Sequence, residues 1–243
     1  MPASINNRRV TDIVLMSDPV IAALPVRECG ERLVDVRTDG QFLVDPRHQD
    51  PEGHFAHVRE GLAGRLLMAQ DALPAGLRIL FIEGYRLPAL QRAYFEEYLR
   101  ELRAGNPCAS EQALFSAASR YVSPPDIAPH SAGAAVDLTL ATDDGTEIDM
   151  GTRVNANPEE SGGACFTGAH SISARARANR DLLGRALASA GFVNYPTEWW
   201  HWSYGDRYWA LGTGAAAACY GAINRAGTLA AWRRQKGWPT GSA

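Results

Sequence analysis

The residues from Leu77 to Tyr85 (L-R-I-L-F-I-E-G-Y) form an almost unbroken apolar run, and this run constrains the fold more than any other feature of the chain. A run of this length, bounded by turn residues, is typical of a buried strand. Before it, residues 54–73 repeat apolar side chains at three- and four-residue steps, which predicts a helix ended by the Pro-Ala-Gly turn at 74–76. After it, Pro88 suits the first turn of a second helix. The chain therefore places a buried strand between two helices.

The second half of the chain adds two strand signals and one long helix signal. Residues 134–140 alternate apolar and polar side chains, which predicts a strand, and an Asp-Asp-Gly-Thr turn then predicts a hairpin with residues 147–150. Residues 173–190 have helical spacing and stop at a glycine. The aromatic block 192–211 is expected to be sheet. Without regular βαβ alternation, these elements predict α+β: a single domain with a central, mostly antiparallel sheet and flanking helices.

The chain length suits one domain, because no stretch rich in proline, glycine or serine divides the 243 residues. We expect residues 1–243 to form one domain, with an N-terminal extension over about 1–38 and a flexible tail over about 234–243. A chain of this length buries most of its unfolded surface and needs no metal or disulfide merely to fold. Any metal site is therefore expected to serve chemistry.

Charge and hydropathy limit the partners. The formal net charge is −3, no block is rich in lysine or arginine, and no apolar stretch approaches the length of a transmembrane helix. We therefore expect no nucleic-acid partner and no membrane span, and a small molecule as the partner.

The N-terminus and the cysteines favour a cytoplasmic protein. The apolar stretch at residues 13–16 is too short for a signal peptide and is broken by Ser-Asp-Pro. The four cysteines are scattered without a C-x-x-C pair, which favours reduced thiols. Two disulfides in an exported form remain open, because four is an even number.

A candidate metal site begins at His130, which ends a proline-rich loop, with Asp137 seven residues later on the predicted strand. Small residues fill the interval and let the backbone pass close to an ion. His201 follows in the segment Glu198-Trp199-Trp200-His201. A catalytic zinc ion commonly has three such protein ligands and one open position. A carboxylate three residues from a ligand is suited to acid–base work on water. Spacing alone leaves the site open, because a His and an Asp seven apart often occur by chance.

Four separate motifs carry a family resemblance. Residues 130–140 (H-S-A-G-A-A-V-D-L-T-L) resemble the H-x-x-G-x-A-x-D-L-T-L signature of the D-alanyl-D-alanine dipeptidases, zinc peptidases known from vancomycin resistance. Residues 198–201 (E-W-W-H) are similar to the family's E-x-W-H signature. Residues 83–86 (E-G-Y-R) resemble its D-G-Y-R-P element, and residues 150–153 (M-G-T-R) fit its M-G-x-R segment. The similarity runs in order from about residue 39 to residue 208.

The resemblance implies a zinc-dependent dipeptidase. It implies one zinc ion held by His130, Asp137 and His201, with Glu198 as the general base and acid. It also implies that Arg86 stabilises the oxyanion of the transition state, where a guanidinium group lowers the barrier as negative charge develops. The implied partner is a small peptide substrate, with D-alanyl-D-alanine first.

The substrate site departs from the family at two positions. The family's dipeptidases carry a serine two residues before the first histidine and an aspartate two residues after the M-G-x-R segment. Ala128 and Asn155 stand at these positions, and Asn155 keeps hydrogen-bonding capacity without the charge. Glu159, Glu160 and Ser131 are candidates for compensating contacts. Trp200 is a candidate for the pocket wall, although core packing is the default for an aromatic residue.

Alternatives to the strict dipeptidase remain. The departures favour a D,D-carboxypeptidase, or a dipeptidase that accepts an N-blocked or extended peptide. A non-catalytic module with a zinc ion is a third alternative, although neither Glu198 nor Arg86 is needed merely to hold zinc. His54 and His57, three residues apart on the predicted helix, form a rival metal pair that is weaker because a solvated helix start explains them.

Overall fold

The computed structural model of the chain describes residues 13–38, 40–47, 50, 52–119 and 121–224. The helices and helical turns are α1 (Pro19–Ala23), η3 (His54–Ala56), α2 (Glu60–Asp71), α3 (Pro88–Gly105), α4 (Glu111–Ala118), η4 (Pro129–Ala132), α5 (Pro158–Ser161), α6 (Ala174–Ser189) and α7 (Arg207–Thr213). The strands are β1 (Leu33–Asp35), β2 (Leu43–Val44), β3 (His57–Arg59), β4 (Leu77–Glu83), β5 (Ala135–Thr142), β6 (Val193–Asn194) and β7 (His201–Ser203).

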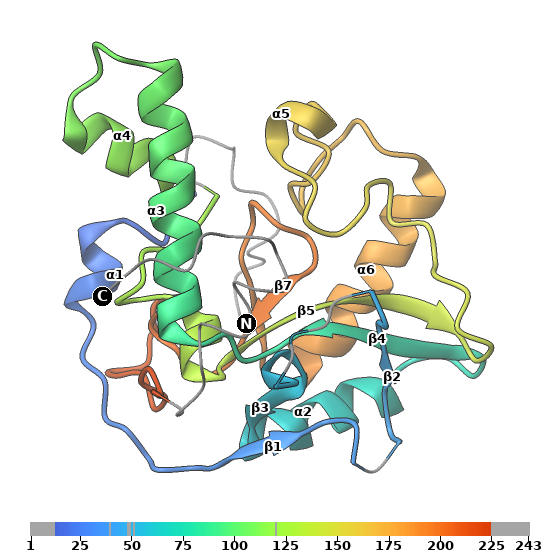
Figure 1. Cartoon of the computed structure of the whole chain (residues 1–243). Helices are drawn as coiled ribbons and strands as arrows, with labels where there is room; N and C mark the ends of the chain where they lie inside the picture. The colour runs from blue at the N-terminus through green and yellow to red at the C-terminus, as the bar shows by residue number, and fades with distance from the viewer. Residues whose placement is uncertain (1–12, 39, 48–49, 51, 120, 225–243) are drawn as a thin grey trace.

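The described strands form a five-stranded sheet in the order β2-β4-β5-β7-β6, beside a two-stranded sheet of β1 and β3 (Figure 1). In the larger sheet β2 runs parallel to β4, and the other neighbours are antiparallel. The prediction of a single α+β domain with a mostly antiparallel sheet and flanking helices is therefore confirmed.

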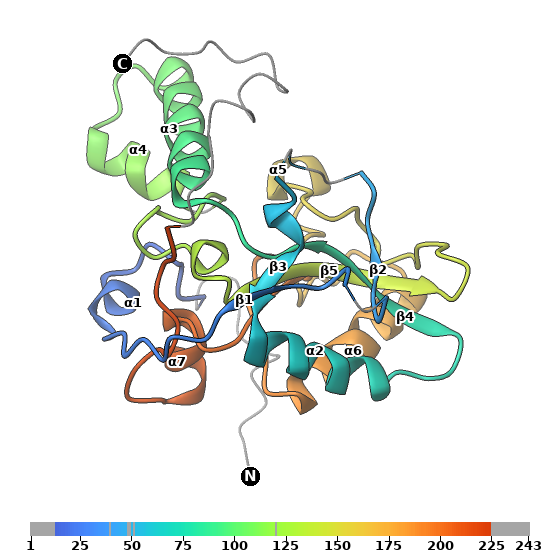
Figure 2. The same ribbon diagram turned by 60° about the horizontal axis from the view of Figure 1, so that its bottom comes forward.

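Helices α2 and α6 cover one face of this sheet and lie side by side in both views (Figures 1 and 2). Strands β4 and β5 are buried along most of their length. This packing makes the central strands a rigid base for any side chain at their ends. The core combines buried apolar residues of both helices and both strands: Leu62, Leu66, Ile79, Phe81, Leu138, Leu140, Leu183 and Leu187.

The helix predicted over residues 54–73 begins later than expected. Its first residues form the turn η3 and the strand β3, and α2 begins at Glu60. Strand β3 pairs antiparallel with β1, where Val34 and Val58 are register partners. A cross-strand pair between the partly buried Val34 and the fully buried Val58 therefore outweighs the local helical spacing.

Two predictions in the second half were also partly wrong. Residues 147–150 pair with β5 through an isolated bridge between Glu147 and Ala141 and do not form a strand. The block 192–211 contains β6 and β7 as expected, but its end forms the helix α7. The Asp206 carboxylate caps α7 by accepting the backbone N–H of Trp209 at 2.9 Å, and this cap outweighs the strand preference of the aromatic residues.

The described part of the N-terminal segment lies on the domain. Helix α1 packs beside α7, Val26 forms a parallel bridge to Ala218, and β1 pairs with β3. The predicted tail at residues 234–243 lies outside the described residues. Among the described residues, no helix combines the length and apolar character needed to cross a membrane.

Candidate metal centre

Strand register brings Asp137 and His201 together. They are direct partners on the antiparallel strands β5 and β7. Antiparallel partners point their side chains to the same face of the sheet, so both side chains meet there. Strand pairing thus delivers two of the three predicted ligands from segments 64 residues apart.

His130 reaches the same place from the turn η4, which precedes β5. The turn ends at Gly133, whose φ of +62° belongs to the left-handed region. A Cβ atom there would also lie 2.4 Å from Cδ2 of Leu33. The Arg59 side chain donates from Nε to the Ala132 carbonyl at 2.8 Å, which fixes the turn against β3.

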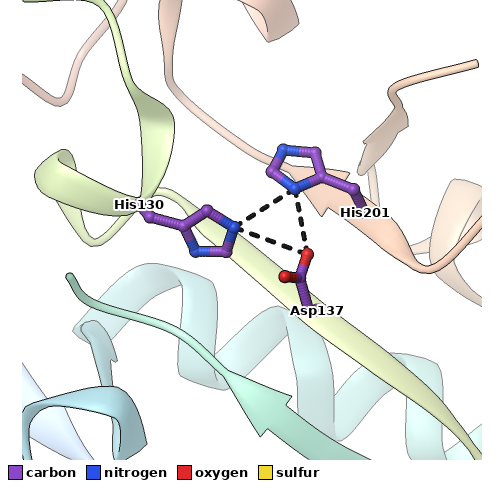
Figure 3. A group of neighbouring side chains, drawn as sticks. All are labelled: His130, Asp137 and His201. Carbon is purple, nitrogen blue, oxygen red and sulfur yellow. Dashed lines mark hydrogen bonds and ion pairs between the residues drawn. The ribbon is translucent and has the colours of Figure 1, made fainter. Parts of the chain in front are cut away.

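The three side chains converge on one point (Figure 3). Nε2 of His130 lies 3.2 Å from Nδ1 of His201 and 3.4 Å from Oδ1 of Asp137. The His201 nitrogen lies 3.0 Å from the same oxygen. All three residues are buried. Within the described part of the chain, they are the one group of three or more His, Cys, Asp or Glu residues whose ligand atoms all lie within 4.8 Å of one another.

The protonation states suit metal ligands. The His130 Nδ1 lies 2.6 Å from the Gly84 carbonyl, which can only accept, so Nδ1 carries the proton and Nε2 offers a lone pair. Burial pushes the pKa of Asp137 upward, but His130 and His201 outweigh it and hold the pKa well below its ordinary value. In His201 the nitrogen that faces the convergence point is Nδ1, and the other nitrogen, Nε2, is buried without a hydrogen-bond partner among the described residues.

Glu198 lies in the turn before β7, as expected from the need to face the same point as His201. The His201 N–H donates to the Glu198 carbonyl at 3.2 Å, and the Glu198 carboxylate lies 3.8 Å from Nδ1 of His201. Burial raises the pKa of Glu198 to about 7; Asp137 adds to the rise, while His201 and Arg86 oppose it. A carboxyl group with this pKa can both take and give a proton near neutral pH.

Arg86 is held by Glu83 and Gln91, to which the sequence alone assigned no role. Glu83 accepts from its Nε at 2.7 Å and from a terminal nitrogen at 2.5 Å, and Gln91 accepts from the other terminal nitrogen at 2.8 Å. Although burial lowers it, the Glu83 carboxylate keeps the pKa of Arg86 above its ordinary value. Glu83 is also the register partner of Asp137. In the sequence, the signal for Glu83 was its acidic side chain within the largely apolar run that forms β4.

The other predicted site residues differ in position. Ser131 is buried beside His130, and Trp200 is buried in the core between β5 and Trp199. The hydroxyl of Ser131 and the indole nitrogen of Trp200 have no hydrogen-bond partner among the described residues. Asn155 is exposed, with a φ of +60°, and its described hydrogen bond runs from Arg153 to its carbonyl. The structure therefore gives Asn155 no contact with the three converging side chains.

The rival pair His54 and His57 does not form a metal group within the described residues. The His54 ring lies 2.7 Å from the Glu52 carboxylate, and Nδ1 of His57 lies 2.9 Å from the Gly53 carbonyl. The rings are edge to face, with centroids 6.4 Å apart. Each histidine therefore has a local contact of its own, although Nδ1 of His54 is buried without a hydrogen-bond partner among the described residues.

Comparison with known proteins identifies the same family. The model of the D-Ala-D-Ala dipeptidase family matches residues 65–213. A D-alanyl-D-alanine dipeptidase of Synechocystis sp. is 30% identical over 219 residues, which cover 77% of this chain and 87% of that protein. One of Escherichia coli is 30% identical over 140 residues, or 56% of this chain and 66% of that protein. A solved mutant of the vancomycin-resistance D,D-pentapeptidase VanY in complex with Zn(II) has 20% identity and a TM-score of 0.40, covering 73% of this chain and 86% of that one. The chain therefore belongs to the D-Ala-D-Ala dipeptidase family and is a hydrolase of the metallopeptidase class.

Proposed function

We propose that this protein is a zinc-dependent peptidase that hydrolyses a short peptide, with D-alanyl-D-alanine as the first candidate substrate. The observation that carries the proposal is the convergence of His130, Asp137 and His201 on one buried point. Membership of the family supports the reaction class, and the geometry of the site supports the roles that we propose for its residues.

The three ligand atoms fit zinc in type and spacing. Two imidazoles and one carboxylate are a common set at catalytic zinc sites. Bonds of about 2.0–2.1 Å in a tetrahedral arrangement place neighbouring ligand atoms roughly 3.3–3.4 Å apart. The observed separations are 3.0, 3.2 and 3.4 Å. When bound, zinc supplies Lewis acidity toward water and the peptide carbonyl.

Glu198 performs the proton transfers in this mechanism. It takes a proton from the attacking water and gives it to the leaving amine, which becomes a good leaving group only when protonated. Burial raises the pKa of Glu198 above its ordinary value, which favours its holding the proton between the two transfers. Its position in a turn, partly exposed, leaves its carboxylate accessible to water and substrate.

Arg86 stabilises the negative charge that develops on the peptide oxygen. Three of its five N–H groups are used by Glu83 and Gln91, so the guanidinium is oriented while donors remain for the substrate. Donors fixed before the reaction lower the barrier more than donors that must reorient.

A second candidate function is a D,D-carboxypeptidase, or a dipeptidase that accepts a blocked or extended amino end. The observation that favours it is the neutral, exposed Asn155, which stands where the family's dipeptidases carry an aspartate. A non-catalytic zinc module is disfavoured, because holding zinc does not require the oriented Arg86 or the protonatable Glu198.

The decisive experiment combines metal analysis with a substrate panel. Purified protein is analysed for zinc by mass spectrometry and assayed for amine release from D,D-, L,D- and N-acetylated dipeptides. We expect zinc to copurify and D-alanyl-D-alanine to be cleaved. Release of amine without zinc, or bound zinc without cleavage of any peptide, contradicts the proposal.

A further inference from the structure

A cavity of about 280 Å³ opens beside Arg86, between helix α3 and the segment that follows α4. In Figure 1, α3 rises away from the sheet on the side where β4 ends, and Arg86 lines the cavity. Its volume is slightly below that of pockets for drug-sized ligands, and it suits one side chain of a peptide. Its lining residues are Arg86, Tyr94, Glu97, Tyr98, Glu101, Tyr121 and Val122.

Aromatic rings form the wall of this cavity. The rings of Tyr98 and Tyr121 meet edge to face with centroids 5.7 Å apart. Tyr94 lies on the same helix, one turn before Tyr98. Burial raises the pKa of Tyr94 to about 12, so its hydroxyl stays neutral. Neutral tyrosine rings offer electron-rich faces to a cation.

Carboxylates surround these rings. Glu97 and Glu101 lie one turn apart on α3 and line the cavity, and neither forms an ion pair within the described residues. Glu159 of α5 accepts a hydrogen bond from the Tyr121 hydroxyl. Burial raises the pKa of Tyr98, and the carboxylates of Glu159 and Glu101 raise it further, as expected at a negative potential.

The positive charge of Arg86 does not cancel this potential. Its guanidinium is paired with Glu83 at 2.5 Å and stacks over Tyr94 at 5.3 Å. The cavity therefore has a neutralised inner end and a negative outer end.

We propose that this cavity is a subsite for a cationic side chain of the peptide substrate, one that ends in an ammonium or guanidinium group. The inference rests on the proposed peptidase function and names a substrate class for it. Tyrosine faces and unpaired carboxylates are the groups that bind an organic cation, whereas an acidic side chain meets repulsion there. A neutral side chain fills the space without gaining the charge interactions.

The test compares peptides that differ only in charge. Three matched pairs carry lysine or norleucine at one position each: D-Lys-D-Ala, D-Ala-D-Lys and Lys-D-Ala-D-Ala against their norleucine counterparts. We expect the lysine member of at least one pair to have a kcat/KM higher by about tenfold at low salt, with the difference shrinking as salt rises. Equal values within all three pairs contradict the inference.

Variants of the cavity carboxylates test whether the lysine preference arises in this cavity. Glu97→Gln/Glu101→Gln should reduce the lysine preference from about tenfold to about twofold, leaving D-alanyl-D-alanine turnover unchanged. Glu96→Gln is the matched control, because Glu96 is exposed on the same helix and does not line the cavity. An equal loss in the control, or an equal effect on norleucine peptides, contradicts the inference.

A binding measurement separates this inference from the proposed function. Calorimetry with lysinamide and norleucinamide on the wild-type protein reports the cavity without turnover. Suppose that no peptide is cleaved, but lysinamide binds more tightly than norleucinamide and the double variant removes this difference in affinity. This result contradicts the proposed function and leaves the subsite supported. Normal cleavage with equal binding of the two amides contradicts the subsite alone.

Discussion

Asp137 and His201 are cross-strand partners, and the register that pairs their backbones holds Oδ1 of Asp137 3.0 Å from Nδ1 of His201. Both strands lie in the buried sheet, so neither backbone segment can move far without breaking strand pairing. His130 joins them from a turn that is anchored to Gly84 and Arg59. Strand register and the anchored turn therefore position all three side chains of the candidate metal centre.

The first prediction concerns the ligands. Because three protein groups define a single site with one open position, the wild type should bind about one zinc ion per chain. His130→Ala and His201→Ala should each lose the metal and the activity, as should the wild type after chelation. Mass spectrometry of the metal content and an amine-release assay measure both. His170→Ala is the control, since His170 is exposed. Retention of zinc by either ligand variant would show that the assignment is wrong.

The second prediction separates the base from the ligands. Glu198→Gln keeps the shape of the side chain but cannot accept a proton, so turnover should fall by about 10²–10⁴ while zinc stays bound. Metal analysis and kcat measured on the same preparation test this directly. Zinc loss equal to that of the histidine variants would make Glu198 a ligand.

The third prediction concerns Arg86. Contacts with the oxyanion form mainly in the transition state, so Arg86→Ala should lower kcat by about 10²–10³ with a smaller change in KM. Arg92→Ala on the exposed face of α3 is the control. An unchanged kcat in Arg86→Ala, or an equal loss in the control, contradicts the proposed role.

The convergence of His130, Asp137 and His201 could be expected because each lies in a short contiguous motif and the motifs occur in the family's order. The strand over residues 134–140 and the helix from Pro88 were predictable because buried periodicity there agrees with local preference. The position of Glu198 outside β7 was predictable from strand geometry. Residues three apart in a strand point to opposite faces, so Glu198 and His201 could not face one point from the same strand.

Long-range contacts were not predictable from these patterns. Strand β3 forms because Val58 pairs with Val34. The residues around Val58 contain no local pattern that predicts this pairing. Gln91 orients Arg86 from a helix position that reads as an ordinary polar residue. The cavity beside Arg86 depends on Tyr121, which comes from a segment with no assigned element.

The fourth prediction concerns the backbone behind His130. A Cβ atom at Gly84 would lie 2.4 Å from the His57 carbonyl, and backbone cannot yield as a flexible side chain can. Gly84→Ala should therefore reduce the free energy of unfolding by about 1–3 kcal/mol. It should also weaken zinc binding, because the Gly84 carbonyl orients His130.

The control for this prediction is Gly64→Ala. Gly64 lies inside α2, where an added Cβ meets nothing within 4 Å, so the substitution should stabilise the protein by roughly 0.5–1 kcal/mol. Urea unfolding of both variants measures the expected decrease in the free energy of unfolding for Gly84→Ala and the expected increase for Gly64→Ala. An unchanged free energy of unfolding in Gly84→Ala would mean that the backbone of β3 can move away from the end of β4 without destabilising the protein.

The last prediction concerns the amino end of the substrate. Asn155 replaces the family's aspartate, and a charge-assisted hydrogen bond is roughly twice as strong as a neutral one. The wild type should therefore discriminate only weakly between D-alanyl-D-alanine and its N-acetylated form. Asn155→Asp is a conservative test, because both residues tolerate the φ of +60° found there. It should raise kcat/KM for the free dipeptide by about fivefold and leave the acetylated peptide unchanged, since only the free amine carries a charge. A strong preference of the wild type for the free amine would restore the strict dipeptidase. Equal gains on both peptides would mean that residue 155 acts through the loop rather than on the ammonium group.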